Sequence, residues 1–244
     1  SNTTEFIEKA MIAFENSDDD KLITLGVAPT RPDVNYSYIQ FIEQPKAIKK
    51  VKSYVDKPDL EFAESFLLSG EFIWNTGILI WSVKSVITAF KEHLPVMYET
   101  LGKYFELPKE IQNIKTLKPI YTTLDVTSIN KGILEKADNV YVIPTTFGWS
   151  DIGTWSAIYE KYKYTGEDQD ENQNTLLCNH FSGYNTANNF IYSTEDKAII
   201  IDGLENYVVI NSDKGLLICP RSNVQQIKSY VSDLKLQKKG EKYC

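Results

Sequence analysis

The chain has 244 residues, 42% of them hydrophobic and 12% aromatic, a composition typical of a packed globular protein with one large domain or one and a half ordinary ones. A formal net charge of −7, with no basic run outside the C-terminal tail, argues against nucleic acid or an anionic membrane as a partner, so any phosphate ligand has to be held locally. Three cysteines without a CxxC pair and only two histidines leave too few ligands for a zinc site, and a reduced, cytoplasmic setting is the simplest interpretation.

The first part of the chain alternates between helical and strand-like patterns. A helix is predicted over residues 3–14, and buried or alternating strands are predicted at Leu22–Val27, Tyr36–Ile42 and Lys49–Val55. The elements predicted next are a helix capped by Asp59 and stopped by Gly70, a strand at Gly77–Trp81, helices at 83–94 and 95–105, a short helix at 128–137, a strand at Val140–Ile143 and a helix after Gly153. This alternation predicts a mainly parallel sheet with helices on both faces.

After about residue 166 the pattern changes. Residues 166–172 are polar, acidic and linker-like, and short strand-like runs follow near 175–179, 188–193, 197–201, 206–210 and 215–219 before a closing helix. Many short, evenly spaced strands indicate a small β domain or a β-helix stack. We therefore expect two domains, residues 1–165 and 166–244.

Polar side chains follow several of the predicted strands. Asp151 stands after a strand and before a helix, where open α/β sheets place their ligand crevice and where a carboxylate can hold a hard cation against phosphate oxygens. From spacing alone, a role as a helix cap is favoured, at about two chances in three. The pair Asp56-Lys57 also lies between a strand and a helix, where a ligand site and an ordinary surface turn are equally compatible with the pattern.

The order of these junctions resembles the mannose-1-phosphate guanylyltransferase family of sugar nucleotidyltransferases, over the C-terminal two thirds of that family's pattern. The most specific match is Phe147–Trp155, which is similar to the family's F-x-W-x-D-V/I/L-G-x-W. The other matches are Tyr54–Pro58 with F-x-E-K-P, Trp74–Gly77 with W-N-S-G, Ser128–Asn130 with S-I-D, Tyr36–Ile39 with Y-G-Y-I, and two tail segments, Asp202–Asn206 and Leu216–Arg221. Their joint order favours a metal-binding role for Asp151 over the cap.

The resemblance implies an α/β fold in which a Rossmann-like mixed sheet, with helices on both faces, precedes a β-helix-like domain. It implies transfer of a guanylyl group from GTP to mannose 1-phosphate, with Asp151 as one of two aspartates on Mg²⁺ and Lys57 as a point charge on the sugar phosphate. The residues it assigns to substrate binding are Tyr36, Ser37, Asp56, Lys57, Asn75, Thr76, Gly77, Asn130 and Trp149. We expect these groups, with Asp151, to edge one sugar-sized hollow.

Several departures from the family pattern modify these expectations. Val34-Asn35-Tyr36-Ser37 replaces T-G-Y-G, so Ser37 would narrow or shift the sugar pocket if only glycine fits there, and Asn130 replaces an aspartate. Asp56 is one carbon shorter than the family's glutamate.

The family's glycine-rich nucleotide loop, G-G-x-G-x-R-L-x-P-L, does not occur in the chain. We therefore expect a fragment that lacks most of the GTP site, is inactive alone, and forms homo-oligomers through exposed apolar surface. The alternatives are a degenerate homologue that binds a sugar phosphate or a subunit without turnover, and a sister enzyme that uses glucose 1-phosphate with a uridine or thymidine nucleotide.

Overall fold

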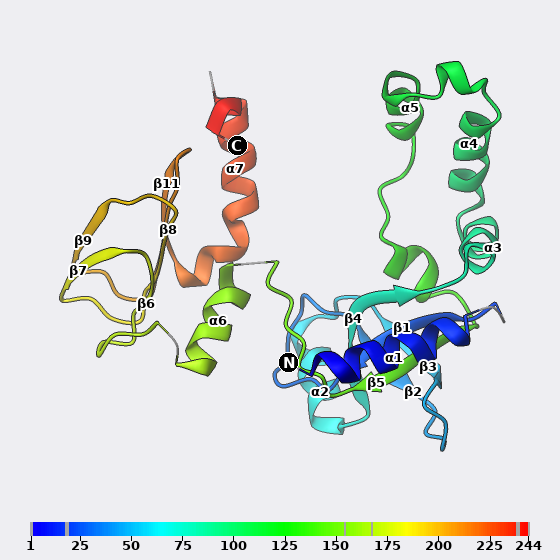
Figure 1. Cartoon of the computed structure of the whole chain (residues 1–244), viewed down its shortest axis with the longest axis horizontal. Coiled ribbons are helices and arrows are strands. Elements are labelled where there is room, and N and C mark those ends of the chain that lie inside the picture. Colours follow the sequence, from blue (N-terminus) through cyan, green and yellow to red (C-terminus); the bar gives the residue numbers. More distant parts are fainter. Residues whose placement is uncertain (1, 18–19, 154, 167, 238–239, 244) are drawn as a thin grey trace. The chain divides into compact units, whose positions relative to one another are not determined.

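The computed structural model describes residues 2–17, 20–153, 155–166, 168–237 and 240–243. The chain forms two compact units, Ser1–Trp149 and Ser150–Cys244 (Figure 1). Helix α6 (Trp155–Thr165) packs in the second unit, where Tyr159 contacts Phe190 in a buried cluster. The boundary between the two units therefore lies after Trp149, earlier than the boundary expected after residue 165.

Five strands build the first unit: β1 (Leu22–Val27), β2 (Tyr38–Phe41), β3 (Lys49–Val55), β4 (Phe72–Ile80) and β5 (Val140–Thr145). They pair in the order β1-β4-β2-β3-β5, and β5 pairs back onto β1, so the strands close into a small barrel. The pair of β1 and β5 is parallel, whereas the other strand pairs described in this unit are antiparallel. The expectation of a mainly parallel sheet was wrong; the neighbours β2 and β3, for example, are joined by a loop without the helical crossover that parallel neighbours need.

The helices of the first unit begin and end largely where the cap residues predict. They are α1 (Thr3–Glu15), α2 (Leu60–Ser69), α3 (Val83–His93), α4 (Pro95–Phe105), α5 (Ile114–Tyr121), a short 3₁₀ helix η1 (Lys109–Ile111) and a π-helical turn η2 (Asn130–Leu134). The Asp59 side chain accepts from the Phe62 amide at 3.0 Å, and Gly70 ends α2 in the left-handed region at φ 68°. Ser82 caps α3 in the same way, accepting from the Ser85 amide.

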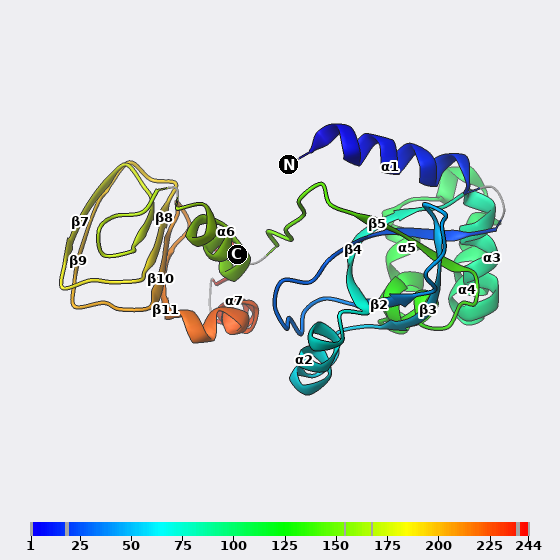
Figure 2. The same cartoon turned by 90° about the horizontal axis from the view of Figure 1, so that it is seen from below.

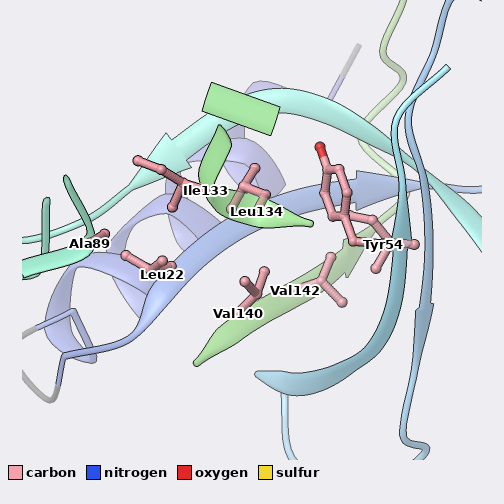
Figure 3. Close-up of a cluster of buried hydrophobic side chains, with 8 residues drawn as sticks. Leu22, Tyr54, Ala89, Ile133, Leu134, Val140 and Val142 are labelled. Carbon is pink, nitrogen blue, oxygen red and sulfur yellow. The ribbon is translucent and has the colours of Figure 1, made fainter. Parts of the chain in front are cut away.

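Buried apolar side chains lie on both sides of the strands. Leu22, Val140 and Val142 point to one side, where they pack with Ile133, Leu134 and Ala89 from η2 and α3 (Figure 3). The alternate residues of the same strands point to the other side, where Ile23, Leu25 and Ile143 pack with Ala13 of α1. Helices on both faces of a mixed sheet are therefore confirmed.

The second unit is a stack of short coils closed by a helix. Strands β6 (Thr175–Leu177), β8 (Phe190–Ser193) and β10 (Tyr207–Asn211) are parallel neighbours, and β11 (Leu216–Pro220) adds antiparallel at the edge. On the other side, β7 (His180–Tyr184) pairs in parallel with β9 (Ala198–Asp202) (Figure 2). The helical segments η3 (Arg221–Gln226), α7 (Ile227–Leu236) and η4 (Gly240–Tyr243) complete the unit.

Buried asparagines connect successive coils of this unit. Asn189 donates to the Asn174 side-chain oxygen at 2.9 Å, and its own side-chain oxygen accepts from the Tyr207 amide at 2.8 Å. Such a ladder satisfies backbone groups at each turn. The predicted β-helix-like architecture is confirmed, although β7 was missed because its residues are mostly exposed and polar. Among the described residues, no helix has the length and apolar character to cross a membrane.

Candidate functional site

Strand β4 carries two buried polar residues of the site, Asn75 and Thr76. Asn75 and Thr76 were predicted to precede a strand, but they lie within one, next to Gly77 at φ 77°. The Asn75 side-chain oxygen accepts from Thr24 Oγ1 at 2.6 Å and from the Gly77 amide at 3.2 Å, and Asn75 Nδ2 donates to Tyr54 Oη at 2.7 Å. Thr76 Oγ1 donates to the Leu25 carbonyl at 2.8 Å. Because these groups are satisfied internally, Asn75 and Thr76 support the site more than they present free atoms to it.

A second polar group lies at the end of β3, where the chain leaves the barrel. Ser37 Oγ donates to Asp56 Oδ1 at 2.6 Å, and Asn130 Nδ2 lies 3.3 Å from both of these oxygens. The Asp56 amide donates to Glu135 Oε1 at 2.8 Å. The structure thus brings together three residues that are far apart in the sequence. Asn130 opens the π-helical turn η2, and such turns frequently mark functional sites.

Tyr54 joins these two groups, and sequence reasoning missed it as a site residue. Burial of its phenol raises the pKa of Tyr54, and the nearby carboxylates of Asp56 and Glu135 raise it further, whereas its hydrogen bonds with Ser37 and Asn75 lower it. The hydroxyl therefore stays protonated and neutral over the physiological range. The available signal was its place inside the Tyr54–Pro58 motif, two residues before the acid.

Lys57 is exposed and has an unusual backbone conformation. Its φ of 51° lies in the left-handed region, which costs a non-glycine residue about 1 kcal/mol. The following Pro58 is buried, and Asp59 caps α2, so the turn is fixed on its C-terminal side. Lys57 directly follows Asp56 in the chain.

Aromatic rings pack around Tyr36, the residue before Ser37 in the chain. Tyr36 makes edge-to-face contacts with Trp74 at 4.9 Å and with Trp149 at 5.2 Å between ring centroids. The Arg31 guanidinium lies over Trp74 at 5.3 Å, and its Nη2 pairs with Asp33 at 2.7 Å. Sequence reasoning treated Arg31 only as part of a rigid loop. The contacts place the predicted residues Tyr36 and Trp149 together.

The segment before Trp149 is held by the start of α1. Glu5 accepts from the Thr146 amide at 2.8 Å and from Thr146 Oγ1 at 3.0 Å, and the Asn2 amide donates to the Phe147 carbonyl at 2.9 Å. Gly148 follows at φ 79°, a conformation that favours glycine. The helix therefore fixes the exit of β5 toward Trp149.

Asp151 belongs to the second unit, so its approach to Lys57 and Asn75 stays a prediction. It is exposed, and its Oδ1 accepts from the Gly153 amide at 2.8 Å. A Cβ at position 153 would lie 2.9 Å from that oxygen, so a side chain there would shift the carboxylate from this position. Residue 154, just before α6, lies outside the described residues.

This arrangement suits a polyhydroxylated anion better than a tightly caged metal. Asp56, Asn130 and Ser37 offer hydrogen-bonding groups for hydroxyls, and Lys57 offers a positive charge for a phosphate. Within the described residues, no three His, Cys, Asp or Glu side chains gather closely enough to hold a metal. Magnesium usually binds through one or two carboxylates with substrate phosphates, so a single aspartate such as Asp151 fits that role.

Comparison with known proteins gives a consistent family assignment. A family model described as nucleotidyl transferase matches residues 3–167, which extends beyond the first compact unit. A mannose-1-phosphate guanylyltransferase of Salmonella typhimurium is 28% identical over 97% of this chain and 48% of its own length. The xanthan biosynthesis protein XanB of Xanthomonas campestris is 27% identical over 94% of this chain and 48% of its own. The chain thus spans about half the length of these curated relatives.

Solved structures show the same fold. A protein from Thermus thermophilus, described as a mannose-1-phosphate geranyltransferase, aligns with a TM-score of 0.78 at 24% identity, covering 96% of this chain and 66% of the other. A mannose-6-phosphate isomerase from Helicobacter pylori aligns with a TM-score of 0.52 at 21% identity, over 62% of this chain and 59% of the other. At these identities the likeness concerns the fold alone.

Proposed function

Because the chain belongs to the nucleotidyl transferase family, we propose that it is the sugar-phosphate-binding part of a mannose-1-phosphate guanylyltransferase, which forms GDP-mannose and pyrophosphate from mannose 1-phosphate and GTP. The observation that carries this proposal is the cluster of Asp56, Asn130 and Ser37 beside Lys57. The family's glycine-rich loop does not occur in the 244 residues. The activity proposed for this chain alone is therefore sugar-phosphate binding, and turnover would need the nucleotide-binding loop.

The proposed reaction depends on positioning and on charge neutralisation, because the sugar phosphate itself is the nucleophile. Asp56 and Asn130 would hydrogen-bond sugar hydroxyls, and Lys57 would attract the phosphate as a point charge. Asp151 would contribute one carboxylate to Mg²⁺, which when bound offsets negative charge on the phosphate oxygens. Tyr36 and Trp149 would line the pocket. We also place the protein in the cytoplasm, as a homo-oligomer.

A second candidate is a homologue that binds sugar phosphate without turnover. The bond of Ser37 to Asp56 favours it, since a protein hydroxyl already occupies part of the acceptor meant for the ligand. The two candidates differ in a turnover assay on the chain supplied with mannose 1-phosphate, GTP, Mg²⁺ and a nucleotide-binding segment of a relative. Product would support the enzyme, and its absence would support the binding homologue.

Both candidates require the chain to bind a sugar phosphate. Calorimetric titration of the whole chain with mannose 1-phosphate tests this binding. Replacing Lys57 with alanine should weaken binding at least about tenfold, which corresponds to about 1.4 kcal/mol. Lys52, an exposed lysine of β3, offers a matched control that should leave affinity unchanged. Wild-type protein that does not bind mannose 1-phosphate, or equal affinity in Lys57→Ala, would remove the basis of the proposal.

A further inference from the structure

The carboxylate of Asp56 is already half occupied by the protein itself. Its Oδ1 accepts from Ser37 Oγ at 2.6 Å and from Asn130 Nδ2 at 3.3 Å. A carboxylate oxygen has two lone-pair positions, so both positions of Oδ1 are in use. No described residue donates a hydrogen bond to Oδ2. Asp56 therefore offers a ligand one oxygen and not two.

The Ser37 hydroxyl is held firmly in this position. The residue is only 4% exposed, and its carbonyl accepts from the Asn75 amide at 2.8 Å, which anchors it beside β4. A short hydrogen bond to an ionised carboxylate is stronger than a neutral one. Ser37 is not among the residues with positive φ, so nothing in its backbone favours moving away. A ligand hydroxyl would have to displace a buried, well-placed donor to reach Oδ1.

This occupancy determines which feature of a sugar the site can read. Two adjacent hydroxyls of a hexose present different geometries in epimers, and a carboxylate distinguishes them best when each of its oxygens accepts one hydroxyl. Because Oδ1 is already hydrogen-bonded within the protein, Asp56 can accept only one sugar hydroxyl, through Oδ2. It therefore cannot distinguish epimers by the relative positions of two adjacent hydroxyls. We propose that Ser37 is a specificity-determining residue that closes Asp56 Oδ1, so that the chain binds hexose 1-phosphates with little discrimination between epimers. This inference rests on the proposed function.

The experiment compares the affinity of the whole chain for mannose 1-phosphate and for glucose 1-phosphate by calorimetry. In the wild type, we expect the two dissociation constants to agree within about threefold. Ser37→Ala frees Oδ1 and should tighten binding of one epimer about tenfold, which is the size of one additional hydrogen bond to a charged group. Ser53→Ala, on the neighbouring β3, is the matched control and should leave both constants unchanged.

The ratio of the two constants is the decisive readout, since a merely structural serine would change both affinities together. Ser37→Cys, which keeps the volume and weakens the donor, should shift the ratio in the same direction if the alanine variant does not fold. A wild type that already separates the epimers tenfold, or variants with an unchanged ratio, would overturn the inference alone. Folded proteins that bind neither sugar phosphate would overturn the proposed function and this inference with it.

Discussion

Replacing Asn75 with alanine should destabilise the first unit strongly, because the side chain connects three elements of the barrel. It is 6% exposed and takes part in three hydrogen bonds, with Thr24 Oγ1, the Gly77 amide and Tyr54 Oη. Each such bond contributes about 1 kcal/mol, so their loss should lower the free energy of unfolding by about 3 kcal/mol. This is a large share of the 5–15 kcal/mol, roughly, that stabilises a typical domain.

In Asn75→Ala, most of the former hydrogen-bond partners keep another partner. Thr24 Oγ1 retains its bond to the Ile78 carbonyl at 3.1 Å, and Gly77 is exposed to water, so only the Tyr54 hydroxyl loses a buried donor. Tyr54→Phe should therefore cost less, about 1–1.5 kcal/mol. The double variant should cost about 1 kcal/mol less than the sum, because the bond between the two residues is counted in both single variants.

The assay is urea unfolding, followed by tryptophan fluorescence and by circular dichroism. Asn35→Ala, an exposed asparagine of the same unit, is the matched control and should change the unfolding free energy by no more than about 0.5 kcal/mol. A cost below about 1 kcal/mol for Asn75→Ala, or strict additivity with Tyr54→Phe, would show that this network does not hold the barrel together.

Three further predictions concern the pH response, the second unit and association. Because the pKa of Tyr54 is raised above its ordinary value of 10.0, the unfolded state releases its proton first, and stability should fall above about pH 10 by up to about 1.4 kcal/mol per pH unit, less so in Tyr54→Phe. Arg221→Ala should lower the free energy of unfolding of the second unit by about 2 kcal/mol, and with it the thermal midpoint, because the guanidinium stacks 3.8 Å from the Tyr159 ring centroid. Arg221→Lys should lower this free energy by about half as much. Met11 and Phe14 on α1 are 50% and 66% exposed, so replacing both with lysine should reduce self-association in light scattering, and a monodisperse wild-type monomer at high concentration would contradict it.

Local signals predicted the elements well. The strands Leu22–Val27 and Lys49–Val55 lie as predicted, because a buried run and an alternating run are direct consequences of the side-chain period in a sheet. The caps Asp59 and Gly70 were recognised for the same reason, since each satisfies backbone groups within a few residues of itself. These features depend on neighbouring residues alone.

Pairing between distant strands could not be predicted in this way. Closure of the barrel depends on the pairing of Lys49 with Val142, and no local pattern in either strand specifies that partner. The extent of β4 was also missed, since Asn75 and Thr76 resemble loop residues until their partners on β1, Thr24 and the Leu25 carbonyl, are known. Polar residues inside a strand are stable only when a distant strand supplies their hydrogen bonds.

The sequence alone does not determine the effect of Ser37, which replaces a glycine of the family motif. The missing glycine predicted a narrower or shifted sugar pocket if only glycine fitted there; Ser37 has no positive φ, and its hydroxyl donates to Asp56. The strained backbone lies instead at Lys57, with φ 51°, where the sequence shows nothing unusual. Glu135 accepts from the Asp56 amide and Asp59 caps the next helix, so the turn is held from both sides against its own preference. The surrounding contacts therefore offset a backbone cost of about 1 kcal/mol at Lys57.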